Sequence, residues 1–132
     1  RAEKRKNDMI VKGFVTNGKR EGGYFLLKEW YARQFREKLG FVPFPGTLNI
    51  RTDEEVPFKE PSGVLESFSE HGKMYGKVTF YLTSLRHDDK VVRCYIVRPS
   101  MAKEKGIIEI VHEQNLRELL GLEDGDAVEL EI

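Results

Sequence analysis

Hydrophobic and polar residues alternate over many short stretches of this chain. In one of them Val78, Phe80 and Leu82 are two positions apart, so their side chains share one face of an extended strand. Turn-forming residues separate the stretches, as His71 and Gly72 do for two of them. The pattern predicts strands over residues 9–16, 24–27, 47–51, 63–69, 74–82, 91–97, 107–111 and 127–132.

Two segments have the spacing of helices instead. In residues 28–39, the side chains of Tyr31, Phe35 and Leu39 recur every four positions and share one face. A shorter helix is predicted over residues 114–120. Its leucines are expected to pack on the strands: Leu116, Leu119 and Leu120. Many short strands with two short helices predict a mainly β fold. A barrel is favoured because closure leaves no unpaired strand edge.

The composition is that of one globular domain. The 132 residues carry 22 Lys and Arg against 22 Asp and Glu, a formal net charge of zero, which argues against a nucleic-acid partner. The one cysteine, Cys94, excludes an internal disulfide and a cysteine-based zinc site. No stretch resembles a membrane span or a signal peptide, so we expect a cytoplasmic protein with no membrane partner.

The first eight residues differ from the rest of the chain. Residues 1–8 are polar and include four basic side chains. They are typical of a frayed terminus, or of a linker from an upstream domain. The remaining residues, 9–132, are expected to form the domain itself.

A glycine-rich segment between two predicted strands is a candidate anion site. Three glycines and two basic residues in close succession suit a loop whose backbone N–H groups approach a phosphate. The same composition is also typical of an ordinary turn. The segment is not a Walker A loop, because no Gly-Lys pair in the chain is followed by Ser or Thr. The candidate nucleotide-binding residues are Gly18, Lys19, Arg20, Glu21, Gly22 and Gly23.

Thr47 and Asn49 are candidate metal ligands. They are two positions apart in a predicted strand, so their side chains point to the same face. Hydroxyl and amide oxygens are hard, neutral ligands that Mg²⁺ accepts, although phosphate oxygens and water would have to complete the coordination. The alternative is that both are turn residues whose side chains bond to nearby backbone.

Two further segments carry polar residues that could contact a ligand. Glu109 interrupts an apolar run and is expected on the face opposite Ile108 and Ile110, where it could bind a polar ligand or face solvent. The start of the shorter helix could attract an anion, with Arg117 adding positive charge, or could belong to an ordinary surface helix. The residues at this helix start are Asn115, Leu116, Arg117 and Glu118.

The order of these segments resembles that of the archaeal CTP-dependent riboflavin kinases. The resemblance covers residues 10–132, and its most specific part is Pro-Phe-x-Gly-Thr-Leu-Asn at 43–49. The other matching segments are Glu-Gly-Gly-Tyr-Phe at 21–25, Ile-Ile-Glu-Ile at 107–110, Leu-Arg-Glu at 116–118 and Gly-Asp-x-Val at 125–128. Each segment is weakly informative alone, and their order indicates the family.

The resemblance implies a six-stranded cradle-loop β-barrel of the riboflavin kinase type. Such an enzyme transfers the γ-phosphate of CTP to the 5′-hydroxyl of riboflavin, giving FMN and CDP, with Mg²⁺ as cofactor. The implied roles are nucleotide binding by residues 18–23 and 115–118, Mg²⁺ binding by Thr47 and Asn49, and flavin binding by Glu109 and Met101. Some members of the family also carry an upstream winged-helix domain.

Two residues depart from the family pattern. Arg20 stands where the family often has glycine, and Met101 stands where it has threonine. A flavin- or nucleotide-binding module without activity is therefore an alternative function. Another alternative is a DNA-binding barrel of the swapped-hairpin type, because related folds share the closing Gly-Asp-x-Val. The sequence identifies no general base.

Overall fold

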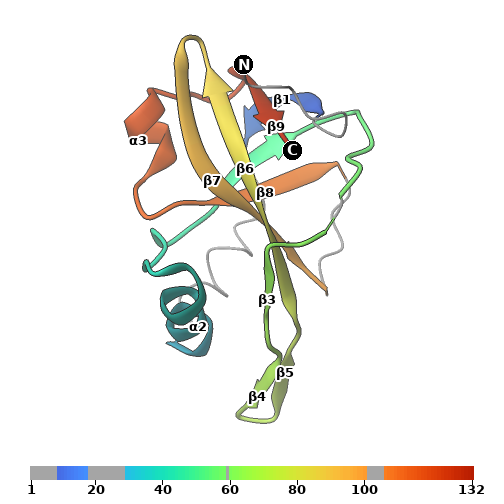
Figure 1. Ribbon diagram of the computed structural model, residues 1–132, viewed down its shortest axis with the longest axis vertical. Coiled ribbons are helices and arrows are strands. Elements are labelled where there is room, and N and C mark those ends of the chain that lie inside the picture. The colour runs from blue at the N-terminus through green and yellow to red at the C-terminus, as the bar shows by residue number, and fades with distance from the viewer. Residues whose placement is uncertain (1–8, 18–28, 59, 101–105) are drawn as a thin grey trace, which may run out of the picture.

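The computed structural model describes residues 9–17, 29–58, 60–100 and 106–132 (Figure 1). Four sequence predictions lie outside these residues. They concern the terminal segment 1–8, the glycine-rich segment 18–23, the strand over 24–27, and Met101.

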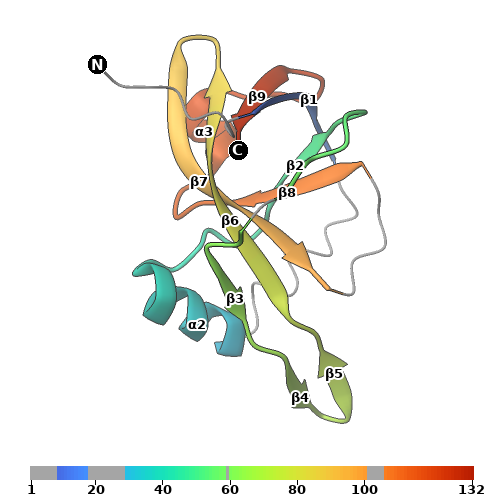
Figure 2. The same cartoon turned by 45° about the vertical axis from the view of Figure 1, so that its right-hand side comes forward.

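Six strands of the described chain form a closed ring (Figure 1, Figure 2). They are β1 (Ile10–Thr16), β2 (Leu48–Arg51), β6 (Val78–His87), β7 (Lys90–Pro99), β8 (Ile107–Val111) and β9 (Ala127–Glu131). Neighbours pair antiparallel in the order β6-β7-β8-β2-β1-β9. Strand β9 pairs in turn with β6, with Leu130 opposite Leu85. These pairings close a six-stranded barrel, which confirms the mainly β fold that the sequence predicted.

The barrel encloses an aliphatic core. Alternate residues of its strands point inward, and Val11, Val15, Leu48 and Ile50 are each at most 6% exposed. Cys94 lies in the same core. Burial raises the pKa of its thiol to about 12, so this cysteine is an inert core residue rather than a nucleophile.

Helix α3 (Leu116–Leu120) packs on the barrel through two of its three leucines. Leu116 and Leu120, four positions apart, belong to the aliphatic core. Leu119 is 40% exposed, so the prediction that all three leucines are core was wrong. A helix of five residues has one inward face, and position 119 lies outside it. Among the described residues, no helix is long and apolar enough to cross a membrane.

A second, aromatic core lies beside the barrel. Its elements are α2 (Glu29–Leu39), β3 (Gly63–Leu65), β4 (Phe68–Glu70), β5 (Lys73–Tyr75) and the first half of β6, and the barrel strands β7 and β8 add Val97 and Val111. Tyr31, Phe35 and Phe80 are at most 2% exposed there. The hairpin formed by β4 and β5 extends away from the barrel, on the side remote from β9 (Figure 2).

Two predicted strands each occur as two shorter ones. Residues 63–69 divide into β3 and β4, and residues 74–82 divide into β5 and the start of β6. Side chains of α2 bond to the backbone at both breaks. The Gln34 amide accepts from the N–H of Glu66 at 2.7 Å and donates to its C=O at 3.2 Å. The Tyr31 hydroxyl donates to the C=O of Gly76 at 2.6 Å. These side chains pair with backbone groups that a neighbouring strand would otherwise bond to.

Strand β6 passes from the aromatic core into the aliphatic one. Its first half pairs with β3 and buries Val78 and Phe80, whereas its second half pairs with β9 and buries Leu85. Between them Leu82 is 42% exposed and Thr83 is buried. The predicted alternation through Leu82 therefore does not describe one continuous buried face, because the strand changes the core that it covers.

Candidate functional site

Three of the predicted site residues meet on the wall of the barrel. Strands β2 and β8 are neighbours, and Asn49 lies directly opposite Glu109 in their register. The Oγ1 atom of Thr47 lies 3.5 Å from Oδ1 of Asn49 and 3.3 Å from Oε1 of Glu109. A hydroxyl, an amide and a carboxylate thus gather at one place, although sequence reasoning treated the first two and the third as separate sites.

Strand geometry explains why these side chains share a face. Leu48 and Ile50 point into the aliphatic core, so Asn49 between them points to the other side of the wall. In the same way, Glu109 lies between the buried Ile108 and Ile110, as predicted. Asn49 is nevertheless only 8% exposed, so its amide is held in a sheltered position.

The cluster suits a hard divalent cation completed by ligand oxygens. Thr47, Asn49 and Glu109 offer oxygen atoms of the kinds that Mg²⁺ binds. Among the described residues, no group of three His, Cys, Asp or Glu side chains could hold a metal ion. One carboxylate with two neutral oxygens binds such an ion weakly alone, so phosphate oxygens of a substrate would be needed to complete its coordination.

Asn115 holds the start of α3, the second predicted site. Its Oδ1 accepts hydrogen bonds from the backbone N–H groups of Arg117 at 3.0 Å and Glu118 at 3.3 Å, which makes it the N-cap of the helix. Leu116 is buried in the aliphatic core, whereas Glu118 is exposed. The cap and the core contact together fix the backbone from which Arg117 projects.

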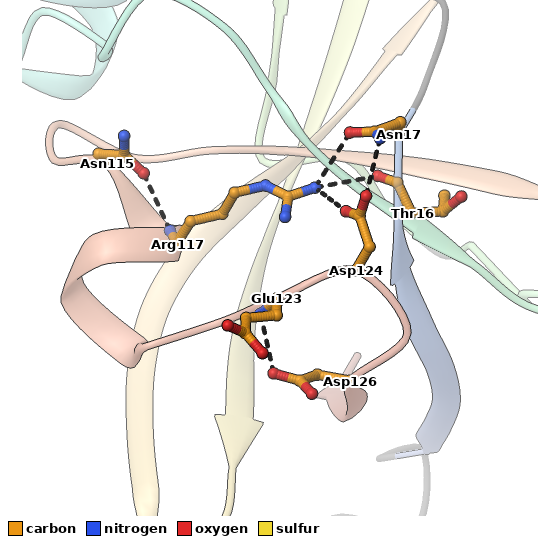
Figure 3. A network of polar contacts seen from close by, with 7 residues as sticks. All are labelled: Thr16, Asn17, Asn115, Arg117, Glu123, Asp124 and Asp126. Carbon is orange, nitrogen blue, oxygen red and sulfur yellow. Dashed lines mark hydrogen bonds and ion pairs between the residues drawn. The ribbon is translucent and has the colours of Figure 1, made fainter.

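Arg117 reaches from α3 to the end of β1 (Figure 3). Its Nη2 donates to Oδ1 of Asp124 at 2.7 Å and lies 3.4 Å from the carbonyl oxygen of Thr16. The second oxygen of Asp124 accepts from Nδ2 of Asn17 at 2.7 Å. Sequence reasoning missed Asn17 and Asp124, because neither residue lies in a segment that was singled out as a candidate site.

The two groups of candidate residues are joined through strand register. Thr16 of β1 lies opposite Asn49 of β2, and Asn49 in turn lies opposite Glu109 of β8. These three residues form a row across three adjacent strands, and Arg117 contacts the backbone at the first of them. The predicted nucleotide segment at α3 and the predicted cation ligands are therefore neighbours in the fold.

A backbone hydrogen bond fixes the segment that leads into Thr47. The N–H of Phe44 donates to the carbonyl oxygen of His112 at 2.8 Å. His112 belongs to the short connection between Glu109 and Asn115. The bond thus ties the proline-rich turn before β2 to the chain that links the two candidate groups.

Comparison with known proteins identifies relatives over most of the chain. The sequence model of the CTP-dependent riboflavin kinase domain, described as domain of unknown function DUF120, matches residues 15–132. The riboflavin kinase of Ignicoccus hospitalis is 39% identical over 127 residues, which are 91% of this chain and 69% of that protein.

Two other riboflavin kinases extend the comparison. That of Archaeoglobus fulgidus is 38% identical, over 92% of this chain and 54% of its own length. That of Thermoplasma acidophilum is 32% identical, over 96% of this chain and 59% of its own length. The chain therefore spans little more than half of each of these two relatives.

Proposed function

Because this chain belongs to the CTP-dependent riboflavin kinase family, we propose that it transfers the γ-phosphate of CTP to the 5′-hydroxyl of riboflavin, giving FMN and CDP. The observation that carries the proposal is the meeting of Thr47, Asn49 and Glu109, one strand away from the carbonyl oxygen that Arg117 contacts on β1. Phosphoryl transfer asks a protein mainly for positioning and charge neutralisation. An oxygen cluster next to a guanidinium group supplies both.

Thr47 and Asn49 are the proposed Mg²⁺ ligands. Bound Mg²⁺ would offset negative charge on the transferring phosphate. The protein's part is to hold the two side-chain oxygens in place. Asn49 is suited to this, because its backbone is paired with strands on both sides and its side chain is sheltered from solvent. Such pre-arrangement avoids the cost of ordering the ligands when substrate binds.

Glu109 is the proposed contact for the flavin. Its carboxylate can accept a hydrogen bond from a ribityl hydroxyl group. Because Oε1 of Glu109 lies 3.3 Å from Oγ1 of Thr47, a hydroxyl held there is brought next to the phosphate site. Proximity of this kind supplies a large part of the rate in such reactions. Met101 is a second proposed flavin contact, on the family resemblance, and lies outside the described residues.

Residues 18–23 and 115–118 are the proposed nucleotide-binding segments. In the second of these, Asn115 and Leu116 fix the helix start and Arg117 supplies a permanent positive charge for the phosphates. The assignment of residues 18–23, and of CTP rather than ATP as the donor, is supported by the family alone.

The test is an assay for product. The purified chain is incubated with riboflavin, Mg²⁺ and either CTP or ATP, and FMN and CDP are measured by chromatography. We expect FMN and CDP in equal amounts with CTP, and far less FMN with ATP. Equal rates with the two nucleotides would contradict the choice of donor. Binding of riboflavin and CDP without any FMN would support the non-catalytic module instead.

A further inference from the structure

Asp124 joins a residue of one proposed nucleotide-binding segment, 115–118, to the residue that directly precedes the other. One of its carboxylate oxygens binds Nη2 of Arg117 and the other binds Nδ2 of Asn17, each at 2.7 Å (Figure 3). Nη2 of Arg117 also lies 3.5 Å from Oδ1 of Asn17. Asn17 is the residue directly before the glycine-rich segment 18–23 in the sequence. The carboxylate is thus the common partner of the end of β1 and the start of α3.

The turn that carries Asp124 is anchored independently of these contacts. The N–H of Gly125 donates to the carbonyl oxygen of Val15 at 2.7 Å. The N–H of Val15 donates to the carbonyl oxygen of Asp126 at 2.9 Å. The side chain of Asp126 also accepts from the N–H of Glu123 at 2.8 Å. The position of Asp124 is therefore set by backbone bonds, and its carboxylate is free to orient other groups.

Arg117 is the group that gains order from Asp124. Its backbone is fixed by the Asn115 cap, but its long side chain is 34% exposed and that of Asp124 is 51% exposed. An ion pair so open to solvent contributes little to the stability of a fold. A guanidinium group already held in one direction, however, loses less conformational entropy when a phosphate binds.

We propose that Asp124 is a positioning residue for the nucleotide, which orients Arg117 and Asn17 for binding of the CTP phosphates. The inference rests on the proposed function, because it requires that Arg117 faces a nucleotide. It predicts a defect in the binding of CTP with no defect in the binding of riboflavin or in the chemical step.

The experiment compares Asp124→Ala with the unaltered chain and with Asp89→Ala, a control at an exposed position in the turn between β6 and β7. We expect Asp124→Ala to raise the KM for CTP, and the dissociation constant of CDP in calorimetry, by about fivefold, the scale of ordering one long side chain. The kcat, the KM for riboflavin and the thermal midpoint should stay at the values of Asp89→Ala.

An exchange variant tests the mechanism of positioning. Asp124→Asn alone places an amide at both positions, 17 and 124, so that Arg117 loses its carboxylate partner. This variant should raise the KM for CTP. Combining it with Asn17→Asp returns a carboxylate within reach of Arg117, which already lies 3.5 Å from that side chain. We expect the double exchange to recover most of the affinity for CTP. Failure of the exchange to recover any affinity would overturn the positioning mechanism.

The outcomes separate this inference from the proposed function. If the unaltered chain neither binds CDP nor forms FMN, the proposed function fails and the inference fails with it. If the unaltered chain is active and Asp124→Ala leaves the KM for CTP unchanged or lowers it, only the inference is overturned. A loss of kcat together with thermal stability in Asp124→Ala would assign a merely structural role and would also overturn it.

Discussion

The barrel and the region around α2 satisfy their backbone hydrogen bonds in different ways. In the barrel, each strand pairs with neighbours on both sides until β9 meets β6, so strand-to-strand hydrogen bonds are continuous. Around α2, strand pairing is interrupted at Glu66 and Gly76, and the side chains of Gln34 and Tyr31 bond to the backbone there. The first region depends on register, and the second depends on a few individual side chains.

The candidate site depends on strand register, as the barrel does. Those of its residues that the structure describes lie on or next to β2, β8 and α3, and the row from Thr16 through Asn49 to Glu109 is set by strand register alone. Register fixes the spacing of backbone atoms across a sheet closely, which suits chemistry that requires oxygens at defined separations. A region held by single side chains fixes the separations between atoms less closely. The comparison predicts that activity and stability can be altered separately.

The largest effect is expected from Asn49→Ala. The substitution removes a proposed cation ligand from the barrel wall, and we expect the rate of FMN formation to fall about 100-fold or more, as when a group aimed at developing charge is removed. Among the described residues, the amide oxygen has a single hydrogen bond, the 3.5 Å contact with Thr47, so the fold should persist. Circular dichroism and thermal unfolding check the fold. Full activity at ordinary Mg²⁺ would remove the ligand assignment.

Gln34→Ala is the matched amide deletion in the other region. Gln34 is 4% exposed, and its loss removes two hydrogen bonds, to the N–H and to the C=O of Glu66. We expect the free energy of unfolding to fall by about 2 to 3 kcal/mol. The kcat below the unfolding transition should not change. Urea titration and steady-state kinetics on the same preparation measure both quantities. A loss of kcat in the folded variant would show that the two regions are coupled.

The barrel has its own point of weakness where β1 crosses β2 closely. A Cβ atom at Gly13 would lie 2.6 Å from Cγ2 of Ile50 and 2.7 Å from the carbonyl oxygen of Arg51. Because a backbone oxygen cannot move aside cheaply, Gly13→Ala should cost about 2 kcal/mol of stability through overpacking. Lys12→Ala, on the outward face of the same strand, is the control. Equal stability of the two variants would contradict the close approach of these strands.

The sequence predicted the barrel better than the α2 region for the same physical reason. Strands with one face in a core repeat every second residue, and this local signal placed four barrel strands within about one residue of their observed ends. The division between β3 and β4 has no local signal. The backbone at this division bonds instead to Gln34, which lies 32 positions away from Glu66 in the sequence.

The predictions for the candidate site also divide into those that follow from a local pattern and those that depend on distant residues. That Thr47 and Asn49 share a face follows from the period of a strand, and the structure agrees. That Glu109 joins them, 62 positions after Thr47, depends on β2 pairing with β8, which no local pattern specifies. Asp124 was missed because a turn composition describes its backbone well and says nothing of the partner of its carboxylate.

The smallest effect is expected at Tyr31, whose hydroxyl bonds to the backbone between the end of β5 and the start of β6. Tyr31→Phe removes the hydroxyl that donates to Gly76 and should cost about 1 kcal/mol near neutral pH.

Burial, with a smaller effect from Tyr75, raises the pKa of Tyr31 above the ordinary 10.0. The folded state therefore favours the protonated phenol. Its contribution is complete below pH 10.0 and is lost as the pH rises through the raised value. Denaturant titrations at increasing alkaline pH should show a shallower decline for Tyr31→Phe than for the unaltered chain. Parallel declines would contradict the buried phenol.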